Sequence, residues 1–212
     1  MSELHPVIKA YSSRIVRWYC RGRFTIIRLR FIDELDQYLP AQGRILDIGC
    51  GFGLFGLVFA RRAPERQLFG YDLNEKRVAM ATEAAAKLGM TNVHFQKGDA
   101  TALAITDRFD GAYMMDIIHH IPVEAVDGLL ASIRAHLNEG GVLLVKDVNR
   151  HPFWKRWFTW WLDKAMDPKT PVNYWSITQL RAKLESHGFK VHVHQMLDIL
   201  PYPHVLYVCR PV

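Results

Sequence analysis

Residues 44–56, Arg-Ile-Leu-Asp-Ile-Gly-Cys-Gly-Phe-Gly-Leu-Phe-Gly, change character in the middle of the stretch. An apolar run of strand type at 45–48 leads into three glycines at a spacing of two: Gly49, Gly51 and Gly53. The apolar residues that follow recur at helical spacing. A ligand at such a turn can touch bare backbone and the positive end of the helix dipole. The stretch therefore predicts a strand, a glycine turn and a helix that together bind a nucleotide.

The composition suits one sizeable α/β domain. The chain has 212 residues, of which 50% are hydrophobic, enough for one such domain and short for two. Its three cysteines are far apart and include no Cys-x-x-Cys pair, which argues against a disulfide framework and a structural zinc site. There is no signal-peptide pattern and no apolar run near the roughly 18 residues that span a bilayer. We expect a cytoplasmic protein whose membrane contact is at most peripheral, at the inner face.

The net charge of +6 comes from the N-terminal arm. Residues 1–31 hold seven basic side chains and one acidic side chain, whereas residues 32–212 hold twenty of each sign. A basic pI that arises from one arm does not indicate a nucleic-acid-binding core. We therefore expect no nucleic-acid partner.

The arm, residues 1–40, is predicted to be helical. Between residues 14 and 29, apolar and basic side chains separate onto two helical faces: Ile15, Trp18, Tyr19, Gly22, Ile26 and Leu29 against Arg14, Arg17, Arg21 and Arg28. Gly22 and residues 25–27 weaken the pattern, so two helices with a break also fit it. A second short helical pattern covers residues 31–39 and ends at Pro40.

Two interpretations of the arm are open. In one, the helix caps an active site and its arginines are only solvated. In the other, the arginine face also rests on anionic lipid headgroups, because a basic helix with Trp, Tyr and Ile matches the interfacial pattern.

Strands and helices alternate after the glycine turn. Six further strands are predicted at residues 67–72, 93–97, 109–115, 142–145, 191–193 and 205–208, and further helices at 75–88, 123–137 and 177–187. This order predicts an α/β fold with a doubly wound, Rossmann-like, mostly parallel seven-stranded sheet and helices on both faces. The last two strands lack a helix between them, so we expect an antiparallel pair at the sheet edge, with the last strand antiparallel.

Acidic residues follow three of these strands. Asp72 ends the second strand, where its carboxylate can accept both hydroxyls of a ribose bound at the first. Asp99 follows the third strand, and Asp116 follows the fourth. The glycines also satisfy the dinucleotide fingerprint Gly-x-Gly-x-x-Gly at residues 51–56, so the glycine turn alone leaves the type of nucleotide open.

The whole set of motifs resembles the class I S-adenosylmethionine-dependent methyltransferases over roughly residues 40–210. Residues 46–53 are similar to the family's first motif, residues 98–100 to the third-strand end that meets the adenine, residues 110–120 to the fourth motif, and residues 137–143 to the approach to the fifth strand. The resemblance implies S-adenosylmethionine as cofactor and no metal. It also implies the cofactor-binding residues Asp47, Gly49, Gly51, Gly53, Asp72, Leu73, Asp99, Ala100, Met115 and Asp116.

Methyl transfer from a sulfonium needs alignment, desolvation and, where the acceptor carries a proton, a base. His119 and His120 follow the fourth strand, and an imidazole titrates in the useful range. His120 is the favoured base and His119 the alternative. A weaker similarity to the phosphoethanolamine methyltransferases, which carry an Asp and a His at the spacing of Asp116 and His120, implies a tyrosine partner from the arm, either Tyr19 or Tyr11.

Five of the six tryptophans lie between residues 154 and 175. Helical spacing in residues 153–166 places an aromatic face opposite a face with Lys155 and Arg156. We expect residues 150–175 to be an insert within a methyltransferase domain at 41–212. The insert either contacts a bilayer or forms a lid over a small acceptor.

We therefore expect a methyltransferase for a small hydrophobic or lipid-linked acceptor, met at a membrane surface through residues 14–31 and 153–166. One alternative is a soluble aromatic or polar metabolite with the aromatic segments as a simple lid. Another is a non-catalytic module that binds the cofactor or a membrane. A nucleic-acid substrate is disfavoured because the fourth strand ends without an Asn-Pro-Pro-aromatic motif or a catalytic cysteine. The acceptor atom, oxygen, nitrogen or carbon, stays open.

Overall fold

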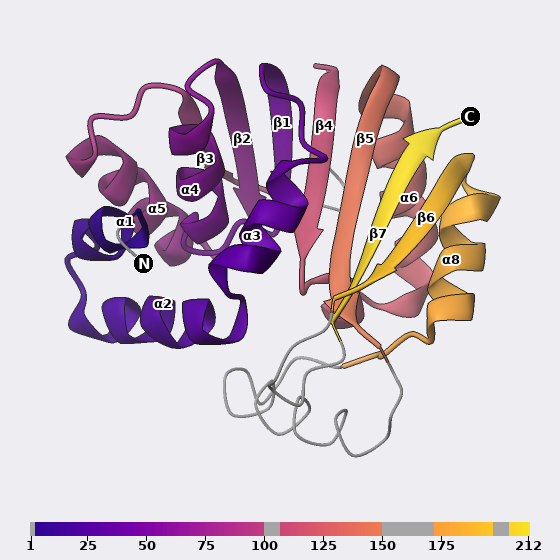
Figure 1. The fold of residues 1–212 in the computed structure, drawn as a ribbon, viewed down its shortest axis with the longest axis horizontal. Coiled ribbons are helices and arrows are strands. Elements are labelled where there is room, and N and C mark those ends of the chain that lie inside the picture. Colours follow the sequence, from indigo (N-terminus) through magenta and orange to yellow (C-terminus); the bar gives the residue numbers. More distant parts are fainter. Residues whose placement is uncertain (1–2, 100–106, 150–171, 197–203) are drawn as a thin grey trace.

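Seven strands form one sheet in the order β3-β2-β1-β4-β5-β7-β6 (Figure 1). The computed structural model describes residues 3–99, 107–149, 172–196 and 204–212. The strands are β1 Gly43–Ile48, β2 Arg66–Asp72, β3 Val93–Lys97, β4 Phe109–Met115, β5 Leu137–Val148, β6 Phe189–Gln195 and β7 His204–Pro211. The first five pair in parallel, and β7 pairs antiparallel with both β5 and β6. The predicted doubly wound, mostly parallel sheet with an antiparallel last strand is confirmed.

Helices cover both faces of this sheet, as predicted. One hydrophobic cluster joins α4 Leu54–Arg62 and α5 Glu75–Lys87 to one face, and a second joins α6 Val123–His136 and α8 Ile177–Ser186 to the other. Neighbouring residues of β1 divide between the clusters: Ile45 packs in the first, Leu46 in the second. This division follows from the alternation of side chains along a strand.

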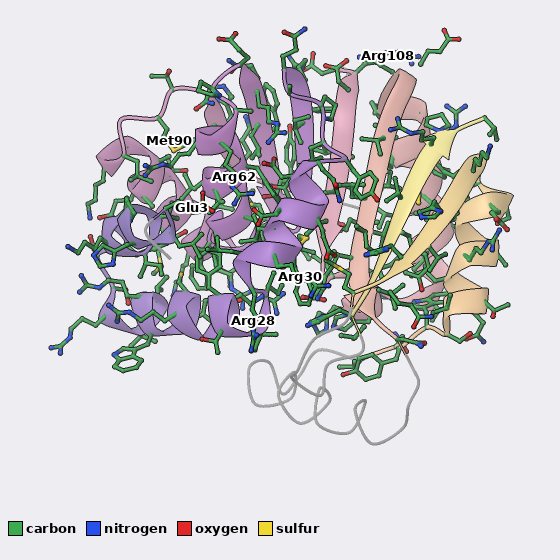
Figure 2. All side chains as sticks on the ribbon, viewed as in Figure 1. Glu3, Arg28, Arg30, Arg62, Met90 and Arg108 are labelled. Atoms are coloured by element: carbon green, nitrogen blue, oxygen red, sulfur yellow. The ribbon has the colours of Figure 1, made fainter. Side chains whose placement is uncertain are left out.

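The arm contains three helices, α1 Leu4–Ala10, α2 Arg14–Ile26 and α3 Leu29–Asp36. The break expected between residues 14 and 29 falls at Ile27 and Arg28, and α2 continues through Gly22. α1 lies within the arm that was predicted to be helical, but no separate helix was predicted there. The arm packs its buried apolar residues in the cluster of α4 and α5, and Arg62 of α4 also pairs with Glu3 and, at 2.7 Å, with Asp33 of α3 (Figure 2).

The predicted apolar face of α2 is buried only in part. The buried residues of α2 are Val16, Cys20 and Phe24, whereas Ile15 is 81% and Trp18 is 70% exposed. Apolar side chains occur on more than one side of this helix, and the side formed by Val16, Cys20 and Phe24 packs in the cluster that contains α4 and α5. The structure therefore buries one apolar stripe and leaves the other outside, beside the arginines.

Helix α2 runs transverse to the strands, below the ends where the parallel strands finish (Figure 1). Chain segments at this edge bind ligands in open α/β sheets. Of the predicted functional segments, Ala100 and residues 153–166 lie outside the described residues. No described helix is long and apolar enough to cross a membrane.

Candidate active site

A cavity of about 1280 Å³ lies at the carboxyl end of the sheet. Its lining comes from the glycine turn after β1, the ends of β2 and β4, the 3₁₀ helix η1 Ile118–His120 and the inner side of α2. Segments far apart in the sequence thus meet at one place. Among the predicted residues, the cavity is lined by Asp47, Gly49, Gly51, Asp72, Leu73, Asp99, Met115, Asp116, His119, His120 and Tyr19.

The glycine turn has backbone conformations that residues with a side chain rarely adopt. Gly49, Gly51 and Gly53 have φ of 72°, 55° and 72°, in the left-handed region. A Cβ on Gly49 would lie 1.8 Å from Ile117 Cδ1, and one on Gly53 would lie 2.7 Å from Phe95 Cζ. Gly53 is not among the residues that line the cavity; it is the N-cap of α4. The helix dipole of α4 therefore begins directly behind the turn.

Asp72 is held at the second strand end by two backbone donors. Its Oδ2 accepts from the Gly51 N–H at 2.8 Å and its Oδ1 from the Asn74 N–H at 2.8 Å. A carboxylate offers about four lone-pair positions, so both oxygens can still accept a ligand hydroxyl. Leu73 beside it is 69% exposed and also lines the cavity. This arrangement suits the predicted role in ribose binding.

Asp47 is a buried carboxyl group on the wall of the cavity, only 3% exposed. Burial raises its pKa to about 7; the Tyr113 hydroxyl opposes the rise, and the negative charge of Asp72 adds to it. A cationic ligand in the cavity would favour the ionised form of Asp47. The site therefore suits a ligand that brings positive charge.

Asp116 follows β4 and bridges two cations. Among the described residues it is the only non-glycine residue with positive φ, at 54°. Its Oδ1 lies 2.5 Å from Lys146 Nζ of β5, and its Oδ2 accepts from Arg23 of α2. Burial alone would raise its pKa, but Lys146, Arg23 and His204 together hold the pKa well below its usual range. Asp116 was predicted at the site, whereas its two cationic partners were not.

His119 forms a buried pair with Asp147 of β5. The distance from His119 Nδ1 to Asp147 Oδ1 is 2.5 Å, and both side chains are 2% exposed. The His119 ring also stacks on Tyr174, with centroids 5.4 Å apart, and lies 4.1 Å from the His120 ring. Such a carboxylate fixes the orientation and tautomer of an imidazole and stabilises its protonated form.

Asp147 and Lys146 were not predicted as site residues. Both lie near the end of the apolar run of β5, and a lysine and an aspartate directly after residues 142–145 are the signal that could have drawn attention to them. Their partners, His119 and Asp116, come from a different strand end, so that only the fold brings each pair together.

Of the two candidate tyrosines, only Tyr19 lies on the cavity among the described residues. Its ring packs 5.3 Å from the ring of Phe52. Tyr11 is 2% exposed, and its hydroxyl donates to the Phe52 carbonyl at 2.8 Å. Tyr11 therefore supports the glycine turn from behind.

Comparison with known proteins gives a consistent result. A family model described as "Methyltransferase domain" matches residues 19–194. Over 130 residues the chain is 33% identical to the ubiquinone biosynthesis O-methyltransferase of Cereibacter sphaeroides (strain ATCC 17029 / ATH 2.4.9), a match that covers 59% of this chain and 50% of the relative. The chain thus spans about half the length of the curated relatives it matches.

Two solved structures share the fold. The PH0226 protein from Pyrococcus horikoshii has a TM-score of 0.70 at 20% identity and covers 95% of this chain and 93% of its own. A protein described as a SAM-dependent methyltransferase from Methanosarcina mazei has a TM-score of 0.67 at 19% identity and covers 84% of this chain and 97% of its own.

Proposed function

This chain belongs to the class I S-adenosylmethionine-dependent methyltransferases, and we propose that it methylates a hydroxyl group of a small hydrophobic acceptor. The observation that carries the proposal is the single cavity in which the glycine turn, Asp72 and the buried His119–Asp147 pair meet. The first two suit a nucleoside cofactor, and the third suits proton removal from a hydroxyl.

The residues present fit S-adenosylmethionine, the cofactor of this family. The glycine turn leaves backbone open to a ligand, and Asp72 stands at the adjacent strand end for a ribose. Asp47 provides a buried carboxylate on the wall of the same cavity. Since S-adenosylmethionine carries a sulfonium and an ammonium group, Asp47 in its ionised form supplies a matching charge.

The cofactor supplies an activated methyl group, so that the protein's own tasks are alignment, exclusion of water and control of one proton. We assign the proton to His119. Asp147 stabilises the imidazolium that forms when His119 accepts a hydroxyl proton. His120, which the sequence favoured, and Tyr19 lie on the same cavity and orient the acceptor.

The hydrophobic character of the proposed acceptor is inferred from the side chains that line the cavity, and its oxygen atom from the relative named above. Phe52, Phe55, Ile117, Ile121 and Val148 provide apolar walls. The curated relative named above is an O-methyltransferase of ubiquinone biosynthesis, which supports an oxygen acceptor on a hydrophobic molecule. We further propose that the acceptor is lipid-linked and is met at a membrane surface. Two segments were expected to make that contact. Residues 153–166 lie outside the described residues, so the support for membrane contact comes from residues 14–31.

The test is methyl transfer from labelled S-adenosylmethionine to three matched sets of acceptors: hydrophobic phenols, their water-soluble counterparts and the corresponding aromatic amines. We expect product from the hydrophobic phenols above all. Preference for the water-soluble phenols would favour the soluble-metabolite alternative, and preference for the amines would contradict an oxygen acceptor. Cofactor binding with no transfer to any acceptor would favour the non-catalytic alternative.

A further inference from the structure

The outer face of α2 exposes two large apolar side chains that the fold does not use. Ile15 and Trp18 are 81% and 70% exposed, although the same helix buries Val16, Cys20 and Phe24. Residues three apart lie side by side on a helix, so the two form one apolar patch. A tryptophan and an isoleucine that are adjacent and exposed to solvent indicate a surface that binds a partner.

Arginines surround this patch. Arg14 and Arg21 are exposed, Arg17 is half-buried, and α2 contains no acidic residue. The Arg21 guanidinium lies 5.6 Å from the centroid of the Trp18 ring, a cation–π contact. None of the three arginines forms an ion pair with another described residue. The face therefore offers positive charge that the described part of the chain leaves without an ion pair.

The adjoining side of the same helix belongs to the active site. Tyr19, Gly22 and Ile26 line the cavity, and Tyr19 and Gly22 lie one helical turn from Ile15 and Trp18, respectively. α2 also lies along the carboxyl edge of the sheet, where it forms an outer surface of the molecule (Figure 1). A surface that contacts this helix is therefore brought next to the cavity.

We propose that the Trp18 face, defined as Arg14, Ile15, Arg17, Trp18 and Arg21, docks the protein on an anionic lipid bilayer. Trp18 and Ile15 enter the boundary between headgroups and acyl chains, and the arginines contact anionic headgroups. Charge complementarity selects this partner, and the apolar pair distinguishes it from a purely electrostatic partner such as a nucleic acid. Docking itself does not depend on the proposed function; delivery of a lipid-linked acceptor to the cavity does.

The test is flotation of the full chain with vesicles of phosphatidylglycerol and phosphatidylcholine, compared with vesicles of phosphatidylcholine alone. We expect the protein to float with the anionic vesicles only. Arg14→Glu with Arg21→Glu should reduce the bound fraction at least tenfold. The matched control, Arg61→Glu with Lys190→Glu, makes the same change in net charge at two exposed residues on other elements and should leave flotation unchanged.

A second pair of substitutions keeps the charge constant. Ile15→Ser with Trp18→Ser should also release the protein from anionic vesicles, because the apolar contact is lost. If both pairs of α2 variants float as well as the wild type, or if the wild type ignores anionic vesicles, the proposal is wrong. Binding that is lost with the arginines but unchanged by Ile15→Ser with Trp18→Ser would show a purely electrostatic contact and would also overturn it.

Calorimetry with S-adenosylmethionine on every variant separates this proposal from the proposed function. The α2 surface variants should bind the cofactor like the wild type, because their changed side chains do not line the cavity. Intact cofactor binding and methyl transfer without vesicle binding would contradict the docking face alone. Vesicle binding without cofactor binding would contradict the proposed function and leave the docking face standing.

Discussion

At the scale of single residues, the contact of His119 with Asp147 suits a general base. The His119–Asp147 pair lies on the cavity beside His120. His119→Gln should therefore lower kcat by about 10²–10⁴-fold, the range of general acid–base catalysis, with cofactor affinity unchanged. Asp147→Asn should lower kcat and also shift the pH–rate profile, since the imidazolium loses its stabilising charge. A larger kcat loss in His120→Gln than in His119→Gln would reverse the assignment.

Asp47 makes the stability of the cofactor-free protein depend on pH. Its folded-state pKa of about 7 lies above the ordinary value of 3.8. The folded protein thus holds this proton more tightly than the unfolded chain, and ionisation destabilises the fold as pH rises from about 4 to about 7. Asp47→Asn lacks this proton equilibrium.

Urea unfolding of the cofactor-free wild type and of Asp47→Asn at about pH 5 and about pH 8 checks this expectation. The free energy of unfolding of the wild type relative to the variant should fall by a few kcal/mol between the two pH values. Parallel pH dependence of the two proteins would show that Asp47 titrates normally.

Gly53 and Gly128 provide a matched pair of glycines. An alanine at Gly53 would combine φ of 72° with a Cβ 2.7 Å from Phe95 Cζ and 2.8 Å from Ala81 Cβ, whereas at Gly128 of α6 nothing lies within 4 Å. Gly53→Ala should cost about 1–3 kcal/mol of stability. Gly128→Ala should add about 0.5–1 kcal/mol, because alanine is the better helix former. Thermal unfolding that ranks the two the other way would contradict this account of the turn.

Sequence reasoning worked best for residues whose role is set by their neighbours in the chain. The three glycines and Asp72 belong to local motifs, and the structure places Gly49, Gly51 and Asp72 on the cavity. Asp147 and Lys146 were not predicted because each pairs with a residue that follows another strand. No local pattern encodes such a pairing.

At the scale of elements, the bridge from Arg23 through Asp116 to Lys146 joins α2 to β5 across the end of β4. The Lys146 side chain is fully buried, so loss of the Asp116 charge leaves a buried ammonium without its ion-pair partner. Asp116→Asn should therefore cost about 3–5 kcal/mol. Asparagine is the right substitute because it tolerates positive φ better than most residues.

The double variant Asp116→Asn with Lys146→Met provides the control. Because it removes the buried cation together with its partner, it should recover much of the stability lost in the single variant. Chemical denaturation of the two variants measures the difference. Equal losses would mean that Lys146 does not depend on Asp116.

The helix α2 shows the limit of periodicity as a predictor. Its apolar residues cover more than half of its circumference, and the pattern alone does not show that Ile15 and Trp18 are exposed. The contacts with the core determine which stripe of α2 is buried: Val16, Cys20 and Phe24 pack in the cluster that contains α4 and α5. The strand β3 was easier, because Thr91-Asn92 and Gly98-Asp99 bound it on both sides.

At the scale of the whole molecule, alternating strands and helices were sufficient to predict the architecture, because parallel strands with helical crossovers have few stable arrangements. The position of β7 between β5 and β6 needed the structure, since the sequence indicates only that the last two strands pair. The same architecture brings the glycine turn, Asp72, Asp116 and His119 to one edge and one cavity.

The measurement that tests the central claim most directly is calorimetric titration of the wild type and of Asp72→Ala with S-adenosylmethionine. Asp72 lies on the cavity and accepts from the glycine turn at 2.8 Å. We predict saturable binding at one site in the wild type and a dissociation constant raised about tenfold or more in the variant, with its circular dichroism spectrum unchanged. Absence of binding in the wild type, or equal affinity in a folded Asp72→Ala, would contradict the assignment of this cavity to the cofactor.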